Sequence, residues 1–252
     1  MSKFAVIVAA AGRSSRFGSQ SPREKKVFRE LHGRPVWLRS VEAFVDRSDV
    51  AQTIVVVSPD DLEWFKEKYA PNLGFLDLEI VAGGAERADS VMNALARVQS
   101  DIDFVAIHDA ARPLVVKQWI DEVFQAAETH GAAIPATAIS STLKRVDGES
   151  IVETVPRERL FAAQTPQVFR RELILEAYAK RGDYEATDES SLVERLGHSV
   201  RVVKGSPMNI KITTQEDLKI AGALLGILPR AKGLDALAPP KDNGLDWLLA
   251  GK

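Results

Sequence analysis

The sequence predicts a doubly wound α/β fold, in which helices cover both faces of a mostly parallel β-sheet. Short apolar runs rich in β-branched residues alternate along the chain with segments whose apolar residues recur at helical spacing. The short runs are continuously hydrophobic rather than alternating, which indicates strands buried on both faces, as in a parallel sheet. Alternating strands and helices connect into such a sheet through right-handed crossovers.

The alternating part occupies the first half of the chain. We expect strands at residues 4–9, 53–58, 78–81, 104–108 and 132–136, because each is a compact apolar run. Apolar residues at helical spacing predict helices at 35–46, 60–69, 86–98 and 117–129. Pro59 followed by Asp60 and Asp61 is typical of a helix start, because acidic side chains favour the first turn.

The alternation breaks after Ala138. Residues 140–146 and 151–155 are β-like and flank a hairpin signal at Asp147-Gly148, so we predict a projecting β-arm at about 139–157. Helical spacing returns at 171–180, 188–196 and 215–225, with a strand near 200–203. We therefore assign residues 1–227 to one domain and interpret 228–252 as an appended extension that need not be ordered.

The composition excludes several classes of protein. The 252 residues carry 33 Lys plus Arg against 35 Asp plus Glu, which excludes a strongly basic nucleic-acid coat and an acidic disordered chain. The chain has no cysteine, so disulfides and thiolate chemistry are excluded, and we expect a cytoplasmic location. No apolar stretch is long enough for a membrane span. We expect neither nucleic acid nor a membrane as a partner.

Positive charge is concentrated in one segment. Residues 13–34 hold seven basic and two acidic side chains, a local charge of +5 in a chain whose net charge is −2. This segment overlaps a loop of small residues at 9–18, which follows the first strand at the edge where open parallel sheets bind ligands. The backbone N–H groups of such a loop can bind phosphate oxygens. The alternative is a plain turn after a strand.

The two common phosphate-binding motifs are both absent from this loop. The dinucleotide motif would need glycine at positions 14 and 17, where Ser14 and Phe17 stand. The P-loop would need Gly at position 17 followed by Lys, and neither is present. These absences argue against an NAD-dependent oxidoreductase and against a P-loop NTPase.

Six segments carry glycine-rich or polar motifs in order along the chain: Ala10-Ala11-Gly12 with Arg16 and Lys26, then residues 83–90, 108–113, 164–167, 187–189 and 209–211. Together they resemble the 2-C-methyl-D-erythritol 4-phosphate cytidylyltransferases, which are nucleotidyltransferases with a glycosyltransferase-A-like fold. The loop before Lys26 is longer than is usual in that family, so Lys25 is an alternative to Lys26. The register with Phe28 favours Lys26.

The resemblance implies transfer of a cytidylyl group from CTP to an alcohol phosphate, a step of isoprenoid precursor synthesis by the non-mevalonate pathway. It implies a nucleotide site of Ala10, Ala11, Gly12, Arg16, Lys26, Gly84, Ala85, Ser90 and Asp109. It implies a substrate site of Asp109, Ala110, Arg112, Thr142, Arg157, Thr165, Thr187 and Lys211. The catalytic residues implied are Arg16, Lys26, Arg157 and Lys211.

The chemistry of this reaction gives an independent reason for these residue types. A phosphate monoester is already a nucleophile, so the barrier lies in joining two anions and stabilising the developing charge. Fixed cations such as Arg16 and Lys26 would do this, together with Mg²⁺ held by Asp109 at the end of a strand. Asp109 could instead cap a helix or pair with Arg112. We interpret His108 as a packing residue, because the reaction needs no base.

Two other motifs allow a structural interpretation. The turn at 83–90 could be a simple strand-to-helix connection, with Arg87 and Asp89 as surface charges. The β-arm cannot bury Leu143, Val146, Ile151 and Val155 alone, which predicts a homodimer. By resemblance, Arg157 would then complete the active site of the second subunit.

Two other functions remain open at this stage. A ribitol 5-phosphate cytidylyltransferase would share the fold and most of the motifs. A non-catalytic nucleotide-binding regulator could use the same fold, although the joint presence of Arg16, Lys26, Asp109 and Lys211 argues against it.

Overall fold

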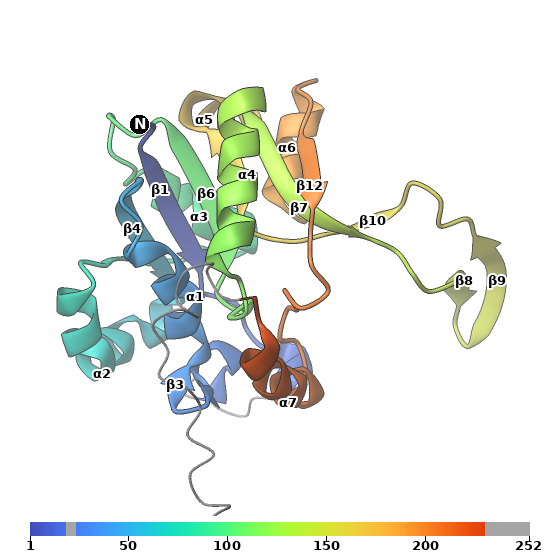
Figure 1. The fold of residues 1–252 in the computed structure, drawn as a ribbon, viewed down its shortest axis with the longest axis horizontal. Helices are drawn as coiled ribbons and strands as arrows, with labels where there is room; N and C mark the ends of the chain where they lie inside the picture. The colour runs from blue at the N-terminus through green and yellow to red at the C-terminus, as the bar shows by residue number, and fades with distance from the viewer. Residues whose placement is uncertain (19–23, 230–252) are drawn as a thin grey trace, which may run out of the picture.

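The structure is a computed structural model that describes residues 1–18 and 24–229. In these residues an eight-stranded sheet has the order β10-β7-β11-β6-β1-β4-β5, with β12 paired to β7 (Figure 1). The strands are β1 (Phe4–Ala9), β4 (Val50–Val57), β5 (Glu79–Ala82), β6 (Phe104–Asp109), β7 (Ala132–Ala138), β10 (Phe161–Ala163), β11 (Gln167–Arg170) and β12 (Arg201–Lys204). Strand β1 is parallel to β4 and β6, β4 to β5, and β12 to β7. The predicted mostly parallel sheet is confirmed.

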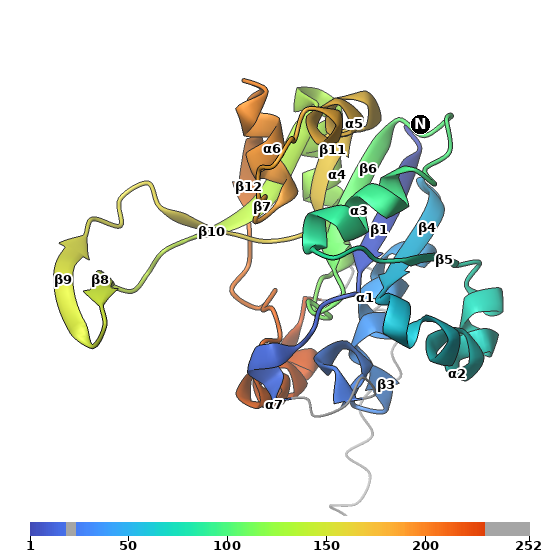
Figure 2. The same cartoon turned by 180° about the vertical axis from the view of Figure 1, so that it is seen from behind.

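Helices cover both faces of the sheet. One face carries α1 (Val36–Val45), α2 (Leu62–Phe75) and α4 (Lys117–His130), and the other carries α3 (Arg87–Leu95), α5 (Arg171–Ala179) and α6 (Glu189–Arg195) (Figures 1 and 2). Strand β1 shows why its sequence is continuously apolar. Phe4, Val6 and Val8 pack into the first layer, whereas Ala5 and Ile7 pack into the second. Both faces are buried, as the hydrophobic pattern predicts.

A smaller apolar cluster lies beside the carboxyl edge of the sheet. It joins Phe17, Leu31, Leu114 and Ile212 to Ala221 of α7 (Gln215–Leu224). The short elements around it are η1 (Ser15–Phe17), η3 (Lys26–Phe28), β2 (Glu30–Leu31), β3 (Arg34–Pro35) and η5 (Leu225–Ile227). This packing holds the basic first loop against the segment that precedes α7.

Strands β10 and β11 were not predicted. Strand β11 lies in the middle of the sheet and runs antiparallel to both β6 and β7, and β10 runs antiparallel to β7. The two central residues of β11, Val168 and Phe169, are fully buried in opposite layers. The apolar run is only these two residues, between Gln167 and Arg170, so periodicity gives it no signal. Its burial comes entirely from the strands on either side.

The predicted β-arm is confirmed as a hairpin. Strands β8 (Leu143–Asp147) and β9 (Ser150–Val155) pair antiparallel in a sheet of their own. Figures 1 and 2 show that this hairpin stands well away from the main sheet. Val146, Ile151 and Val152 are 54%, 64% and 61% exposed, so these three side chains are not buried within this chain, whereas Leu143 and Val155 are half-buried.

In the part of the chain that the structure describes, no helix combines the length and the hydrophobicity that a membrane crossing requires. Most of the appended extension predicted from residue 228, namely residues 230–252, lies outside the described residues.

Candidate active site

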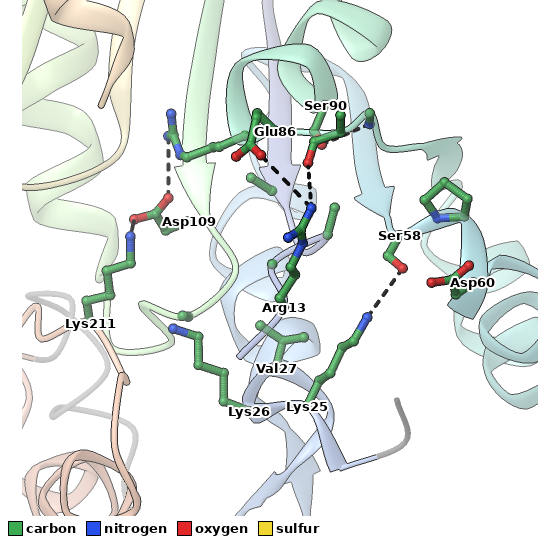
Figure 3. A pocket seen from close by; sticks show the side chains of 18 residues that line it. Arg13, Lys25, Lys26, Val27, Ser58, Asp60, Glu86, Ser90, Asp109 and Lys211 are labelled. Carbon is green, nitrogen blue, oxygen red and sulfur yellow. Dashed lines mark hydrogen bonds and ion pairs between the residues drawn. The ribbon is translucent and has the colours of Figure 1, made fainter. Parts of the chain in front are cut away.

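A cavity of about 690 Å³ opens at the carboxyl end of the parallel strands. The loops after β1, β4, β5 and β6 line it, which is where open parallel sheets bind ligands. Side chains from these loops and from the segment carrying Lys211 point into it (Figure 3). The cavity brings together these residues of the predicted site: Ala11, Gly12, Lys26, Gly84, Ala85, Ser90, Asp109 and Lys211.

Close packing explains the glycines on one wall. A Cβ atom on Gly83 would lie 2.8 Å from the Cβ of Ala11 and 2.8 Å from the Ser90 hydroxyl, and one on Gly84 would lie 2.4 Å from the Cβ of Asp89. The Gly84 N–H donates to the Ser90 hydroxyl at 3.0 Å. The serine therefore fixes the turn, and only glycine lets the backbone approach this closely.

Asp109 lies at the centre of a cluster of cations at the end of β6. Its carboxylate is 2.8 Å from Lys211, 3.4 Å from Arg87 and 3.7 Å from Arg112. Burial opposes ionisation of this carboxyl, but Arg87 and Lys211 outweigh it and hold its pKa well below the usual range. The ion pair with Arg112, one of the alternatives left open by the sequence, is present. The cluster carries more positive than negative charge, as a site for two phosphorylated substrates requires.

Arg87 lines the cavity as well, although the sequence did not mark it as a site residue. Its guanidinium binds Glu189 through two hydrogen bonds of 2.6 and 2.9 Å and reaches Asp109 with the same group. Glu189 is 1% exposed and also accepts the Tyr178 hydroxyl at 3.1 Å. Burial disfavours the charged guanidinium, but Glu189 and Asp109 outweigh it and raise the pKa of Arg87. The interpretation of Arg87 as a surface charge is therefore wrong.

Arg87 and Glu189 each lie inside a motif that the sequence marked. Their pairing joins residues that are 102 positions apart, which no local pattern can show. The interpretation of Asp89 as a plain surface charge is incomplete as well. Its carboxylate forms the capping box of α3 with Glu86 and pairs with Arg181 at 2.7 Å.

The two neighbouring lysines of the first loop have different environments. Lys25 binds the fully buried carboxylate of Asp61 at 2.6 Å and lies 3.3 Å from the Ser58 hydroxyl. Lys26 points toward the side of the cavity that holds Asp109 and Lys211 (Figure 3). Burial, and then the positive charge of Lys211, lower the pKa of the Lys26 ammonium to about 8. This arrangement favours Lys26 as the lysine that faces the ligand.

The arginines of the first loop are placed differently from the expectation. Arg16 lies exposed on η1 and is not among the residues that line the cavity, although its charge acts on Lys26. Arg13 lines the cavity instead. Its guanidinium reaches across to the Ala85 carbonyl at 3.4 Å and the Glu86 carboxylate at 4.0 Å (Figure 3). From the sequence, Arg13 contributes to the local positive charge but is not predicted as a site residue.

Four other predicted residues, Arg112, Thr165, Ala10 and Ala110, lie next to cavity residues without lining the cavity. Arg112 is 3.7 Å from Asp109 and donates to the carbonyls of Asn209 at 2.7 Å and Ala163 at 3.4 Å. Thr165, Ala10 and Ala110 are 4%, 1% and 0% exposed.

Three further predicted residues are exposed and do not line the cavity in this chain. Thr187 is exposed just before α6, and Thr142 and Arg157 are exposed in the β-arm and at its base. Arg157 donates to the carbonyl of Ser140. In this chain, therefore, Arg157 does not face the cavity.

Asp109 is the residue that would hold a metal ion. Within the described residues, no group of three or more His, Cys, Asp or Glu side chains could hold a metal by itself. Mg²⁺ commonly binds one or two carboxylates together with substrate phosphates and water. A single ionised carboxylate that faces a cavity of about 690 Å³ fits that mode, so the ion would bind together with a phosphorylated ligand.

Comparison with known proteins decides the family. The sequence model of the family described as IspD: 2-C-methyl-D-erythritol 4-phosphate cytidylyltransferase matches residues 4–227. The chain belongs to this family. It is 44% identical to the 2-C-methyl-D-erythritol 4-phosphate cytidylyltransferase of Rhodopirellula baltica, over 87% of this chain and 93% of the relative. It is 41% identical to that of Pelotomaculum thermopropionicum, over 89% and 95%.

Solved structures of the IspD family share the fold. The crystal structure of 2-C-methyl-D-erythritol 4-phosphate cytidylyltransferase from Thermus thermophilus matches with a TM-score of 0.73 at 33% identity, covering 87% of this chain and 96% of that one. A crystal structure of a 4-diphosphocytidyl-2C-methyl-D-erythritol synthase matches with a TM-score of 0.76 at 30% identity, covering 89% and 99%. The resemblance recognised from six motifs is confirmed.

Proposed function

We propose that this chain is a cytoplasmic enzyme that transfers the cytidylyl group of CTP to 2-C-methyl-D-erythritol 4-phosphate. The products are 4-diphosphocytidyl-2-C-methyl-D-erythritol and pyrophosphate. Family membership supports the reaction, and one observation carries it: Lys211 and Arg87 pair with the Asp109 carboxylate in a cavity that Lys26 also lines. That arrangement suits the meeting of two phosphate groups.

The acceptor phosphate is the nucleophile, so the protein's task is to position two anions and stabilise charge. Lys26 and Lys211 would bind phosphate oxygens on the side of the cavity nearest Asp109. The Gly84-Ala85 backbone and the Ser90 hydroxyl would bind the nucleoside on the opposite wall. When bound with the nucleotide at Asp109, Mg²⁺ would neutralise charge on the triphosphate. His108 takes no part as a base, because burial lowers the pKa of its imidazole to about 4.

The specificity for the alcohol phosphate is tested by measuring kcat/KM with each of the two candidate acceptors. We expect pyrophosphate release from CTP with 2-C-methyl-D-erythritol 4-phosphate, and a much lower kcat/KM with ribitol 5-phosphate. A higher kcat/KM with ribitol 5-phosphate would assign the chain to that alternative reaction. Release with neither alcohol, at millimolar Mg²⁺, would overturn the enzyme assignment in favour of a non-catalytic nucleotide-binding protein.

The low pKa of Lys26 predicts a pH dependence. Lys26 must be protonated to bind phosphate, and kcat/KM reports the protonation of the free enzyme. We expect kcat/KM for CTP to fall as the pH rises through about 8, where Lys26 loses its proton. In Lys26→Arg the guanidinium stays charged, so this alkaline decrease should move to higher pH. An unchanged alkaline limb in Lys26→Arg would show that another group causes it.

We also propose that the enzyme is a homodimer joined through the β-arm, with Arg157 and Thr142 reaching the partner's substrate site. The exposed apolar residues of the hairpin and the position of Arg157 outside its own cavity support this arrangement.

A complementation experiment tests the shared site. Arg157→Ala and Lys211→Ala should each be nearly inactive, whereas co-expression should give heterodimers with one intact site. Random pairing would then restore roughly a quarter of wild-type activity. No gain over the separate variants would place Arg157 in its own subunit's site. A fully active monomer in sedimentation at micromolar concentration would contradict the dimer.

A further inference from the structure

Hydrogen bonds from two neighbouring elements hold the backbone of the turn that follows Asp109. The Ala110 N–H donates to the Ala9 carbonyl at 3.1 Å, and the Ala110 carbonyl accepts the Ser40 hydroxyl at 2.9 Å. The Arg112 N–H closes the turn on the Asp109 carbonyl at 2.9 Å. The backbone of the turn is therefore fixed by β1 and α1. A further side chain, which takes no part in the proposed reaction, holds the two ends of the turn at Asp109 and Arg112.

That side chain is His108, which is fully buried. Its Nε2 lies 3.1 Å from the Arg112 carbonyl oxygen, and its Nδ1 lies 3.0 Å from the Thr165 hydroxyl. A carbonyl can only accept a hydrogen bond, so Nε2 must carry the proton. Burial disfavours the doubly protonated ring, so Nδ1 accepts the Thr165 hydroxyl proton.

Thr165 extends these hydrogen bonds from His108 to the backbone of Asp109. Its hydroxyl oxygen accepts the Asp109 N–H at 3.0 Å. The Thr165 carbonyl accepts the Asn209 side-chain amide at 2.9 Å, two residues before Lys211. A relay of Asp109 N–H, Thr165 hydroxyl, His108 imidazole and Arg112 carbonyl thus joins β6, the segment before β11 and the segment carrying Lys211.

We propose that His108 is a positioning residue for the cytidylyl transfer, which acts through Thr165 and Arg112 to hold Asp109 and its cations in the reactive arrangement. The inference rests on the proposed function and deepens it. Both ring nitrogens of His108 form their hydrogen bonds inside this relay, to the Arg112 carbonyl and the Thr165 hydroxyl. Asp109 lies where the two phosphates would meet, whereas the Gly84-Ala85 wall would still bind the nucleoside. We therefore expect the relay to affect the chemical step more than the affinity for CTP.

A double-mutant cycle on kcat tests the relay. His108→Phe keeps an aromatic ring but removes both hydrogen bonds, and Thr165→Val keeps the shape but removes the hydroxyl. Each should lower kcat by roughly 10- to 100-fold, because small displacements of reacting groups have effects of this size. If both act through one relay, the double variant should be about as active as the worse single variant. KM for CTP should change by a smaller factor than kcat.

Phe65→Leu is the matched control, because it also changes a fully buried ring, and the Phe65 ring packs on Phe28, Trp37 and Tyr69, away from the relay. Its effect on kcat should multiply with that of Thr165→Val. The proposal would be overturned if the effects of His108→Phe and Thr165→Val on kcat also multiply. It would also be overturned if these variants raise KM for CTP and leave kcat unchanged. If His108→Phe does not fold, as judged by circular dichroism, His108→Gln takes its place, since its amide keeps a donor for the Arg112 carbonyl but removes the Nδ1 acceptor that the Thr165 hydroxyl uses.

Nitrogen NMR of the wild-type protein tests the relay without relying on activity. The His108 ring should carry its proton on Nε2 and none on Nδ1 throughout the neutral pH range. A proton on Nδ1 would overturn the relay. Wild-type protein that shows the expected tautomer but releases no pyrophosphate would contradict the proposed function and, with it, the catalytic role of His108.

Discussion

Replacing Lys211 by methionine is expected to lower kcat by about 10²- to 10³-fold, the usual effect of removing one preorganised group that stabilises transition-state charge. The Lys211 ammonium lies 2.8 Å from the Asp109 carboxylate, at the end of the cavity where the two phosphates would meet. Because the ammonium stabilises charge that develops in the reaction, kcat should fall more than the affinity for CTP. Steady-state kinetics with both substrates varied measure the two effects separately.

Lys219→Met provides the matched control. Lys219 is an exposed residue of α7, on the same side of the molecule but not among the residues that line the cavity. Its replacement makes the same change in net charge, so any general effect of charge on substrate association should appear in both variants. Comparable kcat values in Lys211→Met and Lys219→Met would show that Lys211 has no specific role in the reaction.

Replacing Arg87 by methionine is expected to lower the free energy of unfolding by about 3–5 kcal/mol, because it leaves a buried carboxylate without its counter-ion. Glu189 is 1% exposed and both of its oxygens bind the Arg87 guanidinium, at 2.6 and 2.9 Å. Removing Glu189 as well should restore much of the lost stability, since Arg87→Met/Glu189→Gln has no uncompensated buried charge. Denaturant unfolding of the two variants and the wild type measures both changes.

The control for this prediction is an exposed ion pair of the same length. Lys3 and Asp101 also approach to 2.6 Å, but their side chains are 53% and 58% exposed. Lys3→Met should leave the unfolding midpoint nearly unchanged, because water and salt screen such pairs. Equal destabilisation by Arg87→Met and Lys3→Met would contradict the view that burial gives the Arg87 pair its importance.

The parts of the fold that were predictable have a local cause. The residues of β1 alternate between two buried layers, and this leaves a continuous apolar run in the sequence. The hairpin has its own turn signal at Asp147-Gly148 and was predicted for that reason. Strand β11 has neither kind of signal. Its two buried residues become a strand only because β6 and β7 lie on either side of it.

The candidate site divides in the same way. Motif by motif, the sequence marked Gly84, Ser90, Asp109 and Lys211, and the structure brings these residues to one cavity. The sequence could not show how the motifs contact one another. The pairing of Arg87 with Glu189 and the burial of Lys25 against Asp61 depend on tertiary packing. The same holds for His108, which was interpreted as a packing residue and forms two hydrogen bonds in the core.

Phosphorus NMR of the reaction mixture tests the proposed cytidylyl transfer most directly. Purified protein with CTP, 2-C-methyl-D-erythritol 4-phosphate and Mg²⁺ should give equal amounts of pyrophosphate and a diphosphate diester with two coupled phosphorus signals. Lys211→Met protein at the same concentration should form this product far more slowly. Unchanged CTP would contradict the proposal, as would its hydrolysis to CMP or CDP without a bond to the alcohol phosphate.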